Sequence, residues 1–192
     1  MAPVFSRRFT LRSLFVAGLF PRFSAASDTP TQAVLVRKDE GERLKIGGSI
    51  FDFKLKKNQT GGQLAFAEAV ISVGTLGAPP HLHRTFDEVC YVLEGTVQVW
   101  VEGEVVTLHS GDVHLRPKGK IHTFWNAGKT PAKCLEISMP GGHEDYLRDL
   151  SQLLAKGTRP QPEDFAALAQ KHDIVYFWDK LPEIIKKYQV QL

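Results

Sequence analysis

Three histidines and one glutamate carry the spacing in this sequence that suits chemistry. His81 and His83 are two residues apart, so in an extended segment both side chains point to the same face. Glu88 follows shortly after them, and His122 begins a second segment of similar character. Three neutral imidazoles and one carboxylate suit one divalent transition metal ion: Fe, Mn, Ni, Co, Cu or Zn. Four protein ligands on a six-coordinate ion would leave positions open for a reacting molecule.

The residues around this set predict strands that would bring the four side chains together. A pair of prolines comes just before the first histidine and disfavours a helix there. Residues 89–93, which follow the glutamate, are rich in residues that favour strands. The last histidine comes just after a turn signal at Pro117 and Gly119. Each half therefore resembles a strand, a turn and a strand.

These two halves resemble the two motifs of the cupin family. The first motif is Gly-x5-His-x-His-x3-4-Glu-x6-Gly, and the second is Gly-x5-Pro-x-Gly-x2-His-x3-Asn. The only departure is the opening glycine of the first motif, where this chain has Thr75. The matching positions are His81, His83, Glu88, Gly95, Gly111, Pro117, Gly119, His122 and Asn126.

Within the cupins, the chain looks like small bacterial proteins grouped with quercetin dioxygenase. The likeness rests on the segments PPHLH and YVLEG and on the tail PGGHEDY. It implies a divalent metal held by His81, His83, Glu88 and His122. It also implies that Glu88 is catalytic, because the matching glutamate in the dioxygenase takes a proton from the substrate hydroxyl. A carboxylate within reach of a bound hydroxyl is able to act as such a base.

The pattern along the chain predicts an all-β protein. Many short strands separated by glycine turns are typical of a sandwich or barrel. The resemblance specifies a cupin jelly-roll barrel, a double-stranded β-helix, over residues 31–140, with a strand already at residues 32–37. Residues 141–192 form a helical C-terminal extension, with apolar residues at helical spacing over 143–156, from Pro162 to about His172, and over 182–188.

Composition and the N-terminus limit the classes of partner. The chain has 192 residues with a net charge of +3, and it has no long basic cluster, so we expect no nucleic-acid partner. No apolar run is long enough for a stable membrane span. Residues 1–26 resemble a twin-arginine-type signal peptide, with Arg7 and Arg8 before a short apolar stretch. We expect export, to the periplasm, with a cytoplasmic protein carrying a basic tail as the alternative.

The direction of the ligands predicts which other side chains point inward. If Glu88 points inward, Cys90 and Val92 do so too, since a strand has a period of two. The two cysteines, Cys90 and Cys134, are expected to be buried free thiols, with a disulfide as the alternative. Three aromatic residues are candidates for the wall of a substrate pocket, with ordinary core packing as the alternative: Phe66, Phe86 and Phe124.

The remaining histidines carry no chemical pattern. His114 shares a strand face with Arg116, and we expect that face to point outward. We expect His109, His143 and His172 to be solvated or satisfied by ordinary hydrogen bonds.

Two hypotheses of different class follow. The first is a metal-dependent dioxygenase of a small enolisable or hydroxylated aromatic substrate. The second is a non-catalytic cupin of the cell envelope that binds a metal or small ligand, because a metal site does not by itself fix a reaction. An isomerase-type cupin would need an acid or base off the metal, and the sequence offers no clear candidate. The family resemblance also implies a homodimer.

Overall fold

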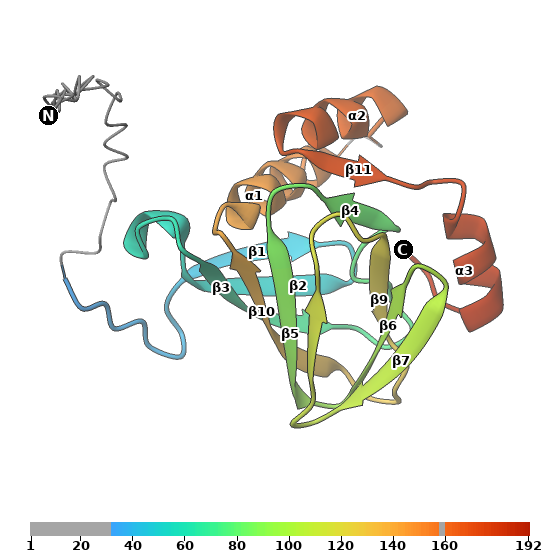
Figure 1. Cartoon of the computed structure of the whole chain (residues 1–192), viewed down its shortest axis with the longest axis horizontal. Coiled ribbons are helices and arrows are strands. Elements are labelled where there is room, and N and C mark those ends of the chain that lie inside the picture. The colour runs from blue at the N-terminus through green and yellow to red at the C-terminus, as the bar shows by residue number, and fades with distance from the viewer. Residues whose placement is uncertain (1–31, 158–159) are drawn as a thin grey trace, which may run out of the picture.

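Two antiparallel sheets face each other, with helices packed beside them (Figure 1). The computed structural model describes residues 32–157 and 160–192. One sheet has the strand order β1-β2-β3-β10-β5-β8, and the other has the order β11-β4-β9-β6-β7. The strands are β1 (Glu42–Ile46), β2 (Ser49–Leu55), β3 (Ala65–Ile71), β4 (His81–His83), β5 (Asp87–Glu94), β6 (Thr96–Val101), β7 (Glu104–His109), β8 (Val113–Arg116), β9 (His122–Asn126), β10 (Ala132–Met139) and β11 (Ile174–Tyr176).

The helices lie where the spacing of apolar residues predicted them. After a short 3-10 turn, η1 (Lys57–Gln59), the described residues contain α1 (His143–Leu154), α2 (Pro162–Lys171) and α3 (Leu181–Tyr188). Proline stands in the first turn of α2 and α3, where a missing backbone N–H costs nothing. The prediction of an all-β jelly-roll barrel with a C-terminal helical extension is confirmed.

The start of the described chain differs from the prediction. Residues 32–37 join neither sheet, so the predicted strand there is wrong. Val34 and Leu35 are 46% and 73% exposed, so the apolar residues of this segment do not form a buried face. The predicted signal peptide, residues 1–26, lies outside the described residues. None of the helices in the described ranges has the length and apolar character needed to cross a membrane.

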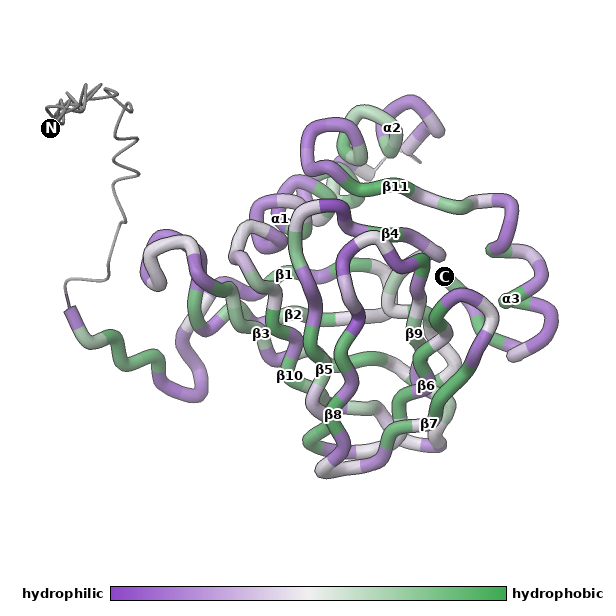
Figure 2. The backbone as a smooth tube through the Cα atoms, viewed as in Figure 1, coloured by the Kyte–Doolittle hydropathy of each residue, from purple (hydrophilic) through white to green (hydrophobic). Residues whose placement is uncertain are grey.

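Alternating burial along the strands builds the core. In β3, the small residues Ala65, Ala67 and Ala69 are almost completely buried while the residues between them are partly exposed. Figure 2 shows hydrophobic and hydrophilic residues alternating along the strands in this way. On β5, Cys90 and Val92 are both fully buried, which confirms that they share the inward face with Glu88.

Strand β9 is buried on both faces because α3 covers its outer side. All five of its residues are buried. Trp125 packs with Ile184 and Val190 in a small separate cluster, and its ring lies 4.6 Å from that of Tyr188. The other face of β9, which carries His122, therefore belongs to the barrel interior.

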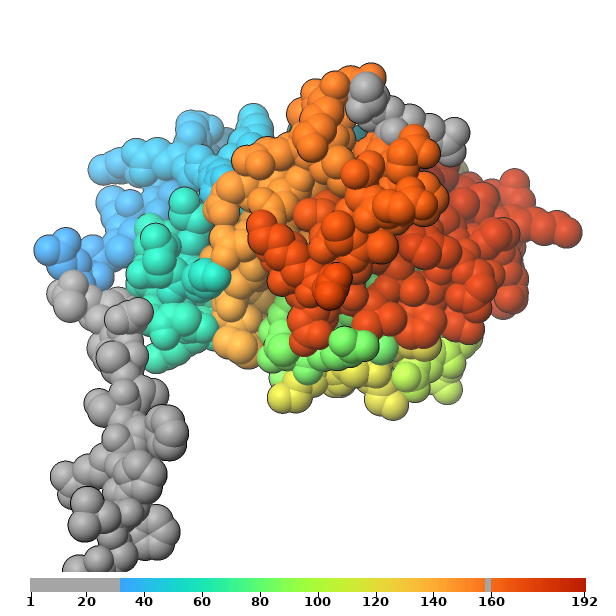
Figure 3. Space-filling model, turned by 90° about the horizontal axis from the view of Figure 1, so that it is seen from above, coloured from blue at the N-terminus to red at the C-terminus, as the bar shows by residue number. Residues whose placement is uncertain are grey.

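The C-terminal extension closes one end of the barrel. Arg148 of α1 makes two hydrogen bonds of 2.6 and 2.8 Å to the Glu42 carboxylate on β1. Strand β11 pairs with β4, with Tyr176 opposite His81. In Figure 3 the orange and red residues of the extension spread over this end of the molecule. The extension thus lies directly over the strand that carries the first two histidines.

Candidate metal centre

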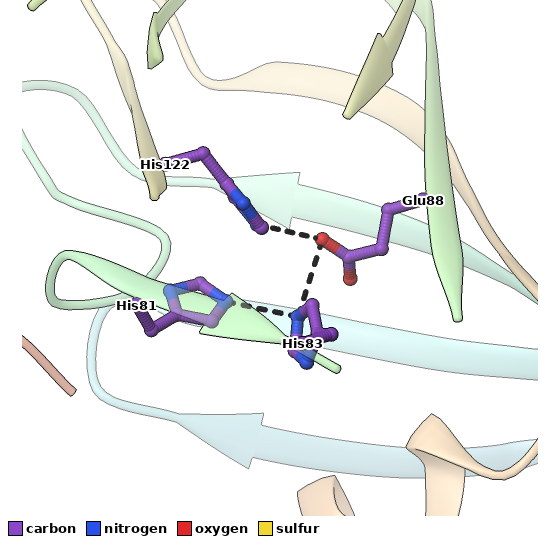
Figure 4. Close-up of side chains that lie close together, drawn as sticks. All are labelled: His81, His83, Glu88 and His122. Carbon is purple, nitrogen blue, oxygen red and sulfur yellow. Dashed lines mark hydrogen bonds and ion pairs between the residues drawn. The ribbon is translucent and has the colours of Figure 1, made fainter. Parts of the chain in front are cut away.

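The four side chains singled out by their spacing meet at one point inside the barrel (Figure 4). The Nε2 atoms of His81 and His83 are 3.0 Å apart. The Oε2 atom of Glu88 lies 3.0 Å from Nε2 of His122 and 3.4 Å from Nε2 of His83. Their possible ligand atoms all lie within 4.8 Å of one another, and each residue is at most 6% exposed. The set forms a buried site that could hold a metal ion.

Register between strands explains the convergence. His81 of β4 lies directly opposite His122 of β9, and His83 follows on the same face of β4. Glu88 arrives from β5, in the other sheet, and points across the interior toward them. The site therefore spans the two sheets and depends on the barrel being closed.

Backbone carbonyls orient two of the imidazoles. Nδ1 of His81 lies 2.8 Å from the carbonyl oxygen of Pro79, and Nδ1 of His122 lies 2.9 Å from that of Lys120. A carbonyl only accepts, so each Nδ1 carries the proton and each Nε2 presents a lone pair to the centre. Lone pairs and a carboxylate oxygen this close repel one another unless a cation lies between them. The donor set therefore fits a divalent transition metal.

Burial favours the neutral form of His81 and His83, and the neutral imidazole is the form that binds a metal. Burial lowers the pKa of His81 well below its usual 6.5, and the nearby imidazoles of His122 and His83 lower it further. Burial likewise lowers the pKa of His83, against the opposing effect of Glu88.

A buried arginine sets the charge of Glu88. Arg116 is 1% exposed, and its Nε lies 3.8 Å from Oε2 of Glu88. Its guanidinium also donates to Glu136 and lies over the Phe124 ring, 4.8 Å from the centroid. Burial alone would raise the pKa of Glu88, but the positive charge of Arg116 holds it well below 4.5. Glu88 is therefore ionised at neutral pH.

The prediction that His114 and Arg116 face outward is wrong. Arg116 pairs with Glu88 across β5 and β8, and His114 pairs with Cys90, so both share the inward face. The apolar residues of this strand, Val113 and Leu115, are instead 63% and 53% exposed. The usual rule of apolar residues inside fails here because the interior holds a carboxylate that needs a charged partner.

A second buried cluster lies beside Arg116. Cys90, Cys134 and Glu136 have possible ligand atoms within 4.8 Å of one another. Both cysteines are free, which confirms the expectation of buried thiols. A hydrogen bond with Cys90, together with burial, raises the pKa of Cys134 well above 9, so this thiol is protonated in the metal-free protein at neutral pH.

A cavity of about 260 Å³ opens from the ligand cluster toward the C-terminal extension. His81 and Glu88 form part of its wall. The rest of the wall is mostly apolar and comes from both the barrel and the extension. It includes Phe51, Phe53, Ala65, Ala67, Phe124, Leu147, Leu150, Phe165, Tyr176 and Trp178. An apolar cavity with a few polar groups at one end is typical of small-molecule sites.

Of the three aromatic residues predicted to line a pocket, only Phe124 does so. Its ring packs against Gly77, where a side-chain carbon would lie 2.1 Å from the ring, so glycine is required there. Phe86 instead stacks on the imidazole of His83, with ring centroids 4.1 Å apart. Phe66 alternates with the buried alanines of β3 and lies on the outer face, opposite Ile137 of β10.

His143 was not expected to have a chemical role, yet its imidazole lies beside the ligand cluster. Its Nε2 is 3.6 Å from Oε1 of Glu88, and it lines the cavity. Its side chain is 15% exposed, and burial lowers its pKa to about 3. The expectation of a solvated or satisfied ring is wrong for His143, because its Nδ1 is buried without a partner among the described residues.

The other two histidines fit the expectation. His109 is exposed, and His172 pairs with Asp149 at 2.7 Å. The position of His143 was not predictable from spacing, because it follows the barrel and is brought back to the site only by the packing of α1. The sequence signal available was the turn at 140–142, which ends the barrel immediately before it.

Comparison with known protein families identifies the fold. The family model described as a cupin domain matches residues 67–138, which include the whole ligand set. A protein of Methanocaldococcus jannaschii is 34% identical over 100 residues, which cover 51% of this chain and 79% of the relative. The chain belongs to the cupin superfamily.

Relatives with a functional name match only in part. Quercetin 2,3-dioxygenase of Bacillus subtilis is 26% identical over 133 residues, covering 67% of this chain and 38% of the relative. A germin-like protein of Arabidopsis thaliana is 33% identical over 99 residues, covering 47% of this chain and 43% of the relative. The chain thus spans less than half the length of either relative.

The solved structure of KdgF from Halomonas sp. has a similar fold. It superposes with a TM-score of 0.52 at 20% identity, covering 58% of this chain and 99% of that one. At this level of identity the likeness describes the barrel and not an activity.

Proposed function

We propose that the protein is a metal-dependent dioxygenase of a small enolisable or hydroxylated aromatic substrate. The observation that carries the proposal is the placement of the His₃Glu set at one end of a mostly apolar cavity. Such a cavity receives a ring system and presents its polar end to the ligand cluster. The partial likeness to quercetin 2,3-dioxygenase supports the same reaction class.

The residues at the site would have separate roles in this reaction. His81, His83, Glu88 and His122 would hold the ion, which when bound supplies a Lewis acid with open coordination positions. Oε2 of Glu88 faces His83 and His122, whereas Oε1 faces His143 on the cavity side. A substrate hydroxyl within hydrogen-bonding distance of the carboxylate would transfer its proton to Glu88 and leave an electron-rich enolate. Dioxygen, the second substrate, would then oxidise the enolate, and both oxygen atoms would enter the product.

The alternative function is a non-catalytic cupin that binds a metal or a small ligand in the cell envelope. The observation in its favour is the position of Arg116. Its charge holds the pKa of Glu88 low, and a carboxylate with a low pKa is a weak base. Under this alternative the same four residues bind the ion, and the cavity holds a ligand that is not changed.

Oxygen consumption separates the two functions. Protein of measured metal content is mixed with a panel of flavonols and β-diketones, and dioxygen uptake and product are followed together. A dioxygenase consumes dioxygen in a fixed ratio to substrate, and the variant Glu88→Gln with matched metal content does not. Fully metal-loaded protein that binds a panel compound but consumes no dioxygen would favour the binding protein instead.

A further inference from the structure

Helix α1 carries an imidazole to the cavity from outside the barrel. His143 is the first residue of this helix, and its ring lines the cavity together with His81 and Glu88. His143 does not belong to the group of residues whose ligand atoms lie within 4.8 Å of one another. The ring therefore faces the site without completing it.

Two features fix the start of the helix. Gly142 has a φ of +136°, a conformation that residues with a side chain rarely adopt, and it turns the chain into α1. The buried carboxylate of Glu144 accepts hydrogen bonds from the backbone N–H of Lys57, at 2.7 Å, and of Gly142, at 2.8 Å. These bonds tie the first turn of α1 to η1, so the backbone that carries His143 has little freedom.

Aromatic neighbours then fix the ring. The ring centroid of His143 lies 4.9 Å from that of His83, 5.2 Å from that of Phe86 and 5.4 Å from that of Tyr146. Its Nε2 points to the Glu88 oxygen that the other histidines leave free, and its Nδ1 has no partner among the described residues. The 3.6 Å between Nε2 and Oε1 is too long for a hydrogen bond, so Nε2 remains available to an oxygen atom of a bound molecule.

We propose that His143 is a substrate-contacting residue, which hydrogen-bonds an oxygen of the bound substrate next to Oε1 of Glu88. A neutral imidazole offers one donor and one acceptor, so it recognises a hydroxyl or a carbonyl. Substrates with an oxygen at this position are held at the ligand cluster, while the apolar walls accept the remainder. This inference rests on the proposed function, because it assumes that an oxygen-bearing molecule enters the cavity.

The test compares three variants. His143→Phe keeps an aromatic ring in the same surroundings but removes both hydrogen-bonding nitrogens. His143→Gln keeps a donor and an acceptor, and His172→Gln is a matched control on a histidine that does not line the cavity. For each, metal content is determined by elemental analysis. The dissociation constant of a flavonol is measured for the metal-loaded and metal-free protein, together with that of the matching flavone without the hydroxyl.

Loss of one hydrogen bond should weaken flavonol binding by about 5- to 10-fold in His143→Phe. Binding by His143→Gln should be weakened less, binding by His172→Gln should be unchanged, and metal content should be unchanged in all three. Equal flavonol affinity in His143→Phe and the natural protein would overturn the contact and leave the proposed function standing. A drop in metal content in His143→Phe would also overturn it, because His143 would then be a ligand. Absence of binding to any panel compound by the natural protein would overturn the proposed function and this inference with it.

Discussion

The two sides of the cavity are built from different material. On the barrel side, short strands place His81, Glu88 and their partners so that nitrogen and oxygen atoms lie 3.0 to 3.4 Å apart. On the extension side, α1 contributes Leu147 and Leu150 to the wall of the cavity. The hydroxyl groups of Tyr146 and Tyr176 form a hydrogen bond with each other. Both sides offer apolar surface, but the four candidate ligands all come from the barrel side.

This difference indicates a division of labour. The barrel side is suited to hold an ion, and the extension side is suited to select the molecule that reaches it. Changes on the barrel side should therefore alter metal content first. Changes on the extension side should leave the metal in place and alter stability or ligand binding.

The largest expected effect is on the barrel side. His83→Ala removes a fully buried candidate ligand, and we expect metal content to fall by about 10-fold or more and any activity to be lost. Elemental analysis of purified protein checks the result, with His172→Ala as the control. Full metal content and activity in His83→Ala would remove the distinction between the two sides.

Glu88→Gln should separate binding from turnover. The amide keeps an oxygen for the ion but cannot accept a proton, so we expect part of the metal to stay and turnover to fall by about 10²- to 10⁴-fold. Metal content and oxygen consumption are measured on the same sample. Turnover equal to that of the natural protein, at equal metal content, would show that Glu88 is a ligand only.

Leu150→Ala tests the extension side. The side chain is 8% exposed and lines the cavity, so its loss should lower the free energy of unfolding by about 2–4 kcal/mol. Urea unfolding measures this change. The folded variant should still bind metal as the natural protein does, and a loss of metal there would show that the two sides are coupled.

The stability of the metal-free protein should also depend on pH. Burial lowers the pKa of His81, His83 and His143 in the folded protein, whereas in the unfolded chain each titrates near 6.5. As the pH falls below about 6.5, the unfolded chain takes up protons that the folded one does not, so the stability of the metal-free protein should decline. Each such histidine contributes at most about 1.4 kcal/mol per pH unit.

The variant His143→Phe sharpens this prediction, because it removes one of the histidines whose pKa is lowered by burial. Its free energy of unfolding should decline less steeply between about pH 7 and pH 5 than that of the natural protein. Chemical unfolding at several pH values measures both slopes. A slope equal to that of the natural protein would show that His143 titrates alike in both states.

Much of the fold followed from local pattern. Strand period placed His81 with His83, and it placed Cys90 with Glu88. The helices of the extension followed from the spacing of their apolar residues and from Pro162. The buried position of Arg116 was harder to predict, because the apolar residues of its strand, Val113 and Leu115, lie on the outer face instead. A pattern of polarity along one strand does not reveal a partner carboxylate on another.

The sequence by itself determined the candidate ligand set and the barrel, since both depend on spacing within short segments and on turns between them. Only the tertiary structure decided that Arg116 lies inside, that Phe66 lies outside and that His143 reaches the site. These three positions depend on pairing between β5 and β8, on which face of β3 lines the barrel, and on how α1 packs on β1. Such contacts join residues far apart in the chain, so no local periodicity contains them.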